Sequence, residues 1–121
     1  MPVTLTQSDL DQFIGSEEFF RHQLGMVYTQ GVHFLAEQAG AFWLIDAIAS
    51  HQPSLRRNSR LKDFQLWTLT VNAAENSAVL TCQEDSDLPA VVTQDIEFTD
   101  FPMPEIKLYV CGRTIMLRSE Y

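Results

Sequence analysis

The most apolar run of this chain, GVHFLAEQAGAFWLIDAIASH at residues 31–51, decides much of what the chain can fold into. Its apolar residues return every three or four positions, which is the spacing of a helix face. A helix that is apolar on nearly every side must be buried, so other elements have to pack around it. Glu37 and Asp46 interrupt the run, and a membrane span needs about 20 apolar residues. We therefore expect a core helix of a soluble domain, bent or broken at Gly40.

Short elements should precede this helix. Thr6 followed by Asp9 predicts a capping box that starts a short helix, with Gly15 as its C-cap. Residues that favour strands lie on both sides of Gly25, so we expect a small hairpin around residues 18–29.

A polar segment should follow the helix. Pro53 predicts the end of the helix, and PSLRRNSRLKD at residues 53–63 predicts a polar loop.

Beyond this loop the apolar pattern changes to that of strands. Five strands are predicted, at residues 64–72, 77–83, 90–98, 106–111 and 114–118. The links between them are short, which favours an antiparallel meander. We expect one α+β domain over residues 1–121, with N-terminal helices packed on one face of a C-terminal antiparallel β-meander of about five strands.

The segment VVTQDIEF at residues 91–98 alternates most clearly. Its even-numbered residues, Val92 to Phe98, should face the core. Its odd-numbered residues should then place Asp95 and Glu97 in solvent. The segment FQLWTLTV carries large apolar groups on both faces, so we expect it to be a central strand.

Asp46 stands one helical turn beyond Phe42 and Trp43. On a straight helix it falls in the apolar sector, so we expect a mostly buried, hydrogen-bonded carboxylate. It can be a structural anchor, or an acid or base in a pocket around Trp43 and Asp46. No second carboxylate or nucleophile can be named for it, which favours the anchor.

Other candidates for chemistry are weaker. His33 and Glu37 are four residues apart and could supply two metal ligands, but no third ligand is evident and a surface pair is the simpler interpretation. Cys82 and Cys111 lack CxxC spacing and are expected to be reduced. No phosphate-binding or nucleophile motif is present. We assign no catalytic residue, cofactor or metal ion, and an enzyme is the less favoured class.

The charge of the chain is a stronger signal. Sixteen acidic and eight basic residues give a net charge of −8. Residues 63–106 hold nine acidic residues and no Lys or Arg, whereas residues 56–62, RRNSRLK, hold four of the eight basic residues. This balance disfavours direct nucleic-acid binding, although the basic segment alone could touch phosphate.

The acidic stretch suggests a face for a protein partner with a basic surface. The residues expected on this face are Glu84, Asp85, Asp87, Asp95 and Glu97. The alternative is an ordinary solvated face of an acidic protein. The N-terminal segment MPVTLTQSDLDQF has neither the basic nor the apolar region of a signal peptide, so we expect a cytoplasmic protein.

Four segments carry a resemblance to an uncharacterised bacterial domain family. They are Thr29-Gln30-Gly31, Phe42-Trp43-Leu44-Ile45-Asp46, Thr99-Asp100-Phe101-Pro102 and Leu117-Arg118-Ser119-Glu120-Tyr121. The family pattern has Asp where this chain has Gln30, and Pro where it has Arg118. The resemblance implies a small single-domain protein from a plasmid, phage or other mobile element, and it implies no activity.

Three functional hypotheses follow. The leading one is an acidic protein-interaction module, encoded by a phage or plasmid, that inhibits a host defence or nucleic-acid-handling protein. The second is a small enzyme or ligand sensor with a pocket around Trp43 and Asp46. The third is a self-assembling structural protein.

Overall fold

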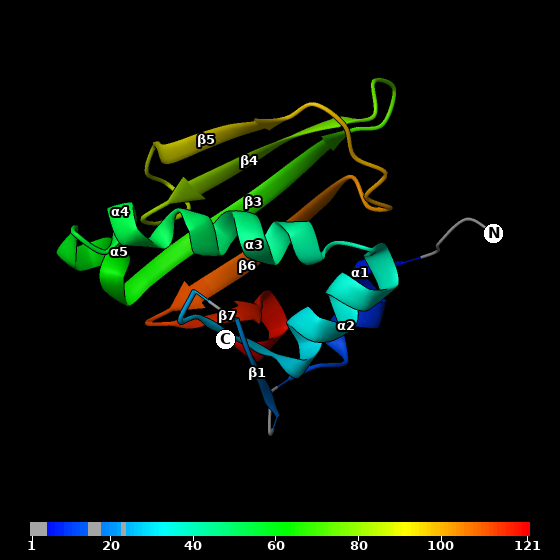
Figure 1. Ribbon diagram of the computed structural model, residues 1–121. Coiled ribbons are helices and arrows are strands. Elements are labelled where there is room, and N and C mark those ends of the chain that lie inside the picture. Colours follow the sequence, from blue (N-terminus) through cyan, green and yellow to red (C-terminus); the bar gives the residue numbers. More distant parts are fainter. Residues whose placement is uncertain (1–4, 15–17, 23) are drawn as a thin grey trace.

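The computed structural model describes residues 5–14, 18–22 and 24–121 (Figure 1). The helices are α1 (Gln7–Asp11), α2 (Gln30–Ala39), α3 (Phe42–Ser50), α4 (Gln52–Leu55), α5 (Ser59–Asp63) and the 3-10 helix η1 (Arg118–Glu120). The strands are β1 (Phe19–Arg21), β2 (Val27–Thr29), β3 (Phe64–Asn72), β4 (Ser77–Gln83), β5 (Ala90–Ile96), β6 (Glu105–Cys111) and β7 (Thr114–Leu117). The α+β class is confirmed.

The sheet differs from the predicted meander. It has seven strands in the order β1-β2-β7-β6-β3-β4-β5, and it is mixed because β2 pairs parallel with β7. Strands β3, β4 and β5 do form a meander, but β6 returns to pair with β3. Ile106, Leu108 and Val110 of β6 are all buried, and a central position in the sheet provides that burial. The prediction that β3 is central is confirmed.

The N-terminal elements largely follow the predictions. Thr6 and Asp9 form the predicted capping box at the start of α1. Gly15 lies outside the described residues, and the C-cap of α1 is Gln12. The predicted hairpin is the antiparallel pair β1–β2. Gly40 adopts a left-handed conformation with φ of 61°, so the long apolar run is two helices, α2 and α3.

The prediction of a loop at residues 53–63 was wrong. Pro53 lies in the first turn of α4, where its missing N–H costs nothing. The Asn58 side chain accepts hydrogen bonds from the backbone N–H groups of Arg60 and Leu61, which starts α5. Leu55 and Leu61 are buried, so tertiary packing stabilises these two helices, which are too short to be stable alone.

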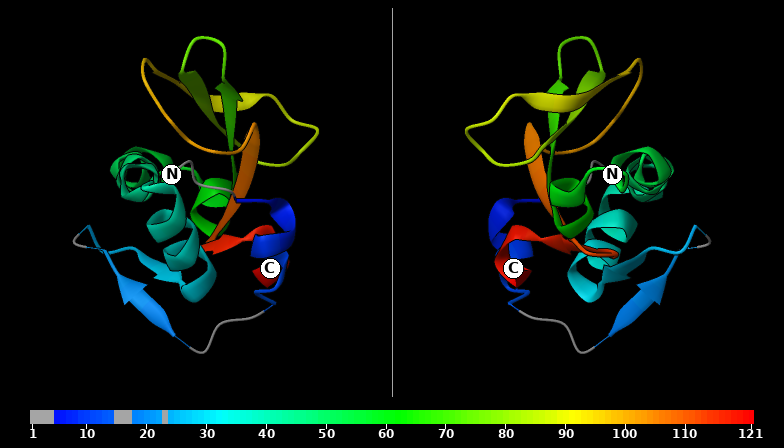
Figure 2. Two further views of the ribbon diagram at one scale, coloured as in Figure 1. Left: turned by 90° about the vertical axis from the view of Figure 1, so that its right-hand side faces the viewer. Right: turned by 90° about the vertical axis from the view of Figure 1, so that its left-hand side faces the viewer.

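Helices lie on both faces of the sheet, whereas one face was expected. Helix α3 crosses β3 and β6 on one face, while α1 and η1 lie on the other (Figures 1 and 2). The core lies under α2 and α3 and includes Trp67, Leu80 and Cys82. In the described part of the chain, no helix is long and apolar enough to cross a membrane.

The C-terminal segment connects the β1–β2 hairpin to the rest of the sheet. Strand β7 runs antiparallel to β6, as predicted, and separates it from β2. The Glu120 carboxylate then accepts hydrogen bonds from the Thr29 hydroxyl at 2.6 Å and from the Gly31 backbone N–H at 3.3 Å. The Tyr121 side chain is 72% exposed, and its ring contacts Phe64 and Tyr109.

Candidate functional site

Asp46 is hydrogen-bonded but not buried. Its side chain is 67% exposed, and its Oδ1 lies 2.6 Å from Nε2 of His22. Leu24 N–H donates to Nδ1 of His22, so the proton on the neutral ring is on Nε2 and is donated to Asp46. The expectation of burial was wrong because the break at Gly40 changes the direction of α3 and turns Asp46 outward. Asp46 therefore links α3 to the β1–β2 hairpin.

The contact between His22 and Asp46 could not be read from the sequence. The two residues lie on different elements, and no local spacing connects them. Trp43 is half-buried and packs against the core. His22 lines a cavity of about 330 Å³ together with Arg21, Gly25, Met26 and Val27, and neither Trp43 nor Asp46 is among its lining residues.

The five acidic residues proposed for partner binding fall into two groups. Glu84 is 20% exposed, lies 3.7 Å from the Arg60 guanidinium and accepts a hydrogen bond from Asn58, so it faces α5. Asp85 and Asp87 are exposed in the turn between β4 and β5.

Asp95 and Glu97 form the second group, at the other end of β5. Both are exposed, and Asp95 points away from α3 because its neighbour Gln94 bonds to His51 beside that helix. Asp87 and Asp95 are eight residues apart. The strand between them rises about 3.3 Å per residue, so the two groups do not form a single cluster.

Strand β5 is an edge of the sheet. Within the residues described, it pairs with β4 alone, so its second backbone edge is open. Val92, Gln94 and Ile96 on its core side are half-buried, and Val91 on its other side is 47% exposed. Phe98 was expected in the core but is 74% exposed, because the strand ends at Ile96.

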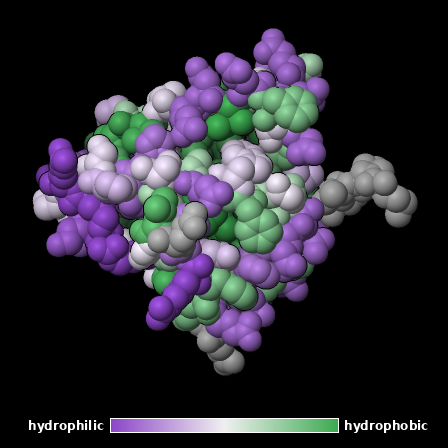
Figure 3. All heavy atoms as spheres, viewed as in Figure 1, coloured by the Kyte–Doolittle hydropathy of each residue, from purple (hydrophilic) through white to green (hydrophobic). Residues whose placement is uncertain are grey.

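The basic segment forms one end of the molecule. Figure 3 shows strongly hydrophilic residues gathered where Figure 1 draws α4 and α5. Arg56 donates to the carbonyl of Gly112 at 2.9 Å, and Arg60 pairs with Glu84. Two of the four basic residues in this segment therefore have structural partners.

His33 and Glu37 form a surface pair. Nδ1 of His33 lies 2.9 Å from Oε1 of Glu37, and the imidazole stacks on Phe20 with ring centroids 4.0 Å apart. Both residues line an aromatic cavity of about 280 Å³. No group of three or more His, Cys, Asp or Glu residues suited to a metal ion occurs in the described ranges.

Both cysteines are free thiols. Burial raises the pKa of Cys82 to about 12 and also raises the pKa of Cys111. A raised pKa keeps a thiol protonated at neutral pH, which makes it a poor nucleophile.

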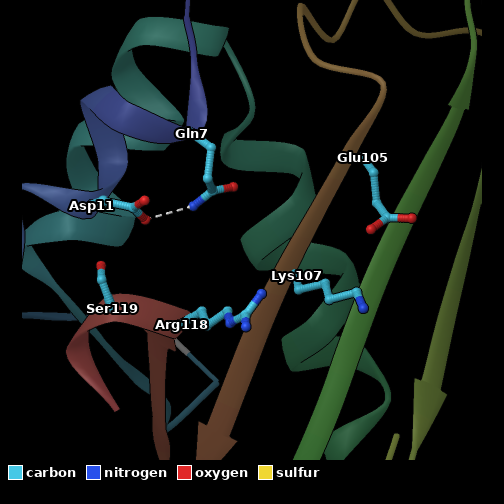
Figure 4. A pocket seen from close by; sticks show the side chains of 6 residues that line it. All are labelled: Gln7, Asp11, Glu105, Lys107, Arg118 and Ser119. Atoms are coloured by element: carbon cyan, nitrogen blue, oxygen red, sulfur yellow. Dashed lines mark hydrogen bonds between the residues drawn. The ribbon is translucent and has the colours of Figure 1, made fainter.

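The largest of the cavities described here lies between α1, β6 and η1, and has a volume of about 480 Å³. It is lined by Gln7, Asp11, Glu105, Lys107, Arg118 and Ser119 (Figure 4). The sequence analysis missed this site because its residues come from three elements far apart in the chain. One signal could have pointed to it, which is the alternation along β6. This alternation places Glu105 and Lys107 on the face of the strand that is opposite to the buried Ile106 and Leu108.

The segments that carry the family resemblance support the fold. Thr29, Gly31 and Glu120 fasten the start of α2 to the C-terminal segment. The Thr99 hydroxyl accepts a hydrogen bond from the N–H of Phe101, whose side chain is buried. These contacts explain the residues without invoking catalysis.

Comparison with known proteins gives one match. Residues 4–121 match the profile of a family of unknown function, DUF6876. No curated protein and no solved structure matches the chain. Because the match covers nearly the whole sequence, the chain belongs to this family of unknown function.

Proposed function

We propose that this protein is a small interaction module that binds an extended, basic segment of a partner protein along β5. The observation that carries the proposal is the open edge of β5, a strand of seven residues as long as β4 and β6. Exposed edge strands are normally short, bulged or covered, because an open edge accepts further strands. Strand β5 has one register shift at its start, between the pairs Gln83–Ala90 and Cys82–Val92, and from Val92 to Ile96 it pairs regularly with β4 and keeps its outer edge open. A partner strand can add to such an edge through backbone hydrogen bonds.

The side chains of β5 suggest the sequence of the partner strand. One face of β5 presents Thr93 and Asp95, and Glu97 follows at its end. The other face presents the half-buried Val92 and Ile96. An added strand that alternates basic and apolar residues would place its charges beside the carboxylates and its apolar groups beside Val92 and Ile96.

The charge of the whole molecule supports the same class of partner. A net charge of −8 attracts basic surfaces and speeds their association at low salt. Basic surfaces are typical of nucleic-acid-handling proteins, so we propose inhibition of such a protein, or of a host defence protein, as the biological role. The resemblance to proteins of plasmids and phages supports this setting, and we propose that the protein acts in the cytoplasm of a bacterial host.

The alternative enzyme or sensor has less geometric support. The two ring nitrogens of His22 are both engaged, one by Asp46 and one by the Leu24 N–H. The ring has no free nitrogen to exchange a proton with a substrate.

A synthetic peptide of alternating Lys and Val residues tests the proposal. We expect saturable shifts of the β5 backbone amides in NMR spectra, and weaker binding as salt approaches about 1 M, where the screening length is about 3 Å. A peptide of the same composition with all Lys residues in one block is the matched control, because it loses the alternation but keeps the charge. Equal binding of both peptides, or shifts away from β5, would contradict the proposal.

Charge reversal locates the contact. The Asp95→Lys, Glu97→Lys double variant should bind the peptide at least tenfold more weakly, with a nearly unchanged melting temperature because both residues are exposed. Asp85→Lys with Asp87→Lys changes the net charge equally at the other end of β5. If both pairs weaken binding to the same extent, total charge is responsible and the β5 face is not the site.

A further inference from the structure

The cavity between α1, β6 and η1 contains two positive and two negative side chains. Figure 4 shows Gln7, Asp11 and Ser119 together on the side of α1 and η1, with Glu105 and Lys107 across the cavity on β6. Arg118 extends from η1 toward the space between them. Two of the eight basic residues of this acidic protein therefore border one cavity.

The side chains of these two cations are unpaired in the part of the chain that the structure describes. Within the described residues, no salt bridge or side-chain hydrogen bond involves Lys107 or Arg118, although Asp11 and Glu105 border the same cavity. Asp11 accepts one hydrogen bond, from Nε2 of Gln7 at 2.9 Å. Oppositely charged groups around one cavity that do not pair with each other remain available to a ligand.

The acceptors on the α1 side suit an ammonium group. Because Gln7 uses its Nε2 to bond Asp11, its Oε1 is left as an acceptor. The Ser119 hydroxyl donates to the carbonyl of Leu10 at 3.3 Å, so its oxygen can accept as well. Asp11, Gln7 and Ser119 thus offer acceptors to the three N–H donors of an ammonium group.

The charge balance selects between ligand classes. The two cations and two carboxylates sum to zero, and the whole chain carries a charge of −8. A simple anion would meet two repulsive carboxylates and the overall negative field, while a simple cation would meet Lys107 and Arg118. A neutral zwitterion can satisfy both signs at once.

We infer that this cavity binds a small zwitterion of the amino-acid class. The ligand carboxylate lies against Arg118 and Lys107, where the guanidinium can form two parallel hydrogen bonds. The ligand ammonium lies against Asp11, Gln7 and Ser119. This site is separate from β5, so the interaction proposed above can fail while this inference holds, and the reverse is also true.

Titration of the whole protein with glycine, β-alanine and 4-aminobutyrate tests the inference by NMR. The lining side chains are exposed or half-buried, so we expect dissociation constants on the order of 1 mM. Saturable shifts should map to α1, β6 and η1, and one member of the series should bind best because its charge separation fits the cavity. Acetate and ethylammonium carry one charge each and should bind at least tenfold more weakly.

Two variants give the decisive comparison. Arg118→Gln and Asp11→Asn should each weaken binding of the best zwitterion about tenfold, since each removes a charged hydrogen-bonding partner. Arg57→Gln is the matched control, because it removes an exposed charge outside the cavity and should leave binding unchanged. Lys107→Gln provides a second cation variant if Arg118→Gln alters the melting temperature. Non-saturable shifts, equal binding of acetate, or wild-type binding by the cavity variants would overturn the inference.

Discussion

Gly31 allows the start of α2 to pack closely against the C-terminal segment, because it has no Cβ atom. A Cβ added to Gly31 would lie 2.6 Å from Oε1 of Glu120 and 2.7 Å from Cδ1 of Leu117. Only glycine allows the start of α2 to approach the C-terminal segment so closely. The backbone N–H of Gly31 then donates to Glu120.

We therefore expect Gly31→Ala to lower the free energy of unfolding by about 1–3 kcal/mol, despite the better helix propensity of alanine. Urea denaturation measures the change. Gln38→Ala, on an exposed position of the same helix, should be neutral or slightly stabilising. Equal stability of Gly31→Ala and the wild type would mean that the C-terminal segment can shift away from α2 without lowering the free energy of unfolding.

The thiol of Cys82 makes stability depend on pH. Burial raises its pKa from 9.0 to about 12, so between these values the folded protein holds a proton that the unfolded chain releases. This contribution to stability is fully present below pH 9 and is lost as pH rises toward 12. Between about pH 8 and about pH 10, urea denaturation should show a larger decrease in the free energy of unfolding for the wild type than for Cys82→Ala. The variant is the matched control, because all other titrating groups are the same in both proteins. Parallel losses in the two proteins would contradict the buried thiol.

Asp46 faces outward on α3 and connects two elements of the fold. Its side chain is 67% exposed, so its bond to His22 joins the hairpin to α3 in contact with solvent. Asp46→Ala should lower the free energy of unfolding by less than about 1 kcal/mol, as is usual for exposed pairs. Thermal or urea denaturation of the variant tests this value. A loss of about 3 kcal/mol would restore the interpretation of a buried anchor.

Strand β7 joins two parts of the sheet, because it lies between β2 and β6. Deleting residues 115–121 removes most of β7 together with Glu120, so the β1–β2 hairpin loses both its sheet partner and its link to the C-terminal segment. We expect the shortened chain to lose cooperative thermal unfolding. Deleting Tyr121 alone should change the melting temperature little, since its side chain is 72% exposed. A chain without residues 115–121 that melts as the wild type does would contradict this role.

Local signals account for the elements that could be predicted. The strand-favouring residues at 64–72 and 77–83 gave the observed bounds of β3 and β4, and the Thr6 capping box and Gly40 marked real helix ends. The parallel pairing of β2 with β7 could not be predicted, because it joins distant residues and leaves no local pattern. The same holds for the cavity, whose residues share no spacing, and for the outward turn of Asp46, which depends on the angle set at Gly40.

At the scale of the molecule, one connected core underlies both helices and sheet. It includes residues from α1, from α2 and α3, and from the strands β3, β4, β6 and β7. We expect one cooperative unfolding transition, with the same midpoint by tryptophan fluorescence and by far-ultraviolet circular dichroism. Addition of a chelator should leave this midpoint unchanged, because a core of this size needs no metal ion for folding. Two separated midpoints would show that the hairpin side unfolds independently.

The position of β7 also sets an order of events during synthesis. Residues 114–121 leave the ribosome after every other described element of this fold, yet in the described part of the chain the β1–β2 hairpin joins the sheet only through β7. Until they emerge, β2 and β6 lack the neighbour that lies between them, and each presents an open edge to other chains. A nascent chain that stops before residue 114 therefore has early and late parts of the sheet that cannot yet pair with each other.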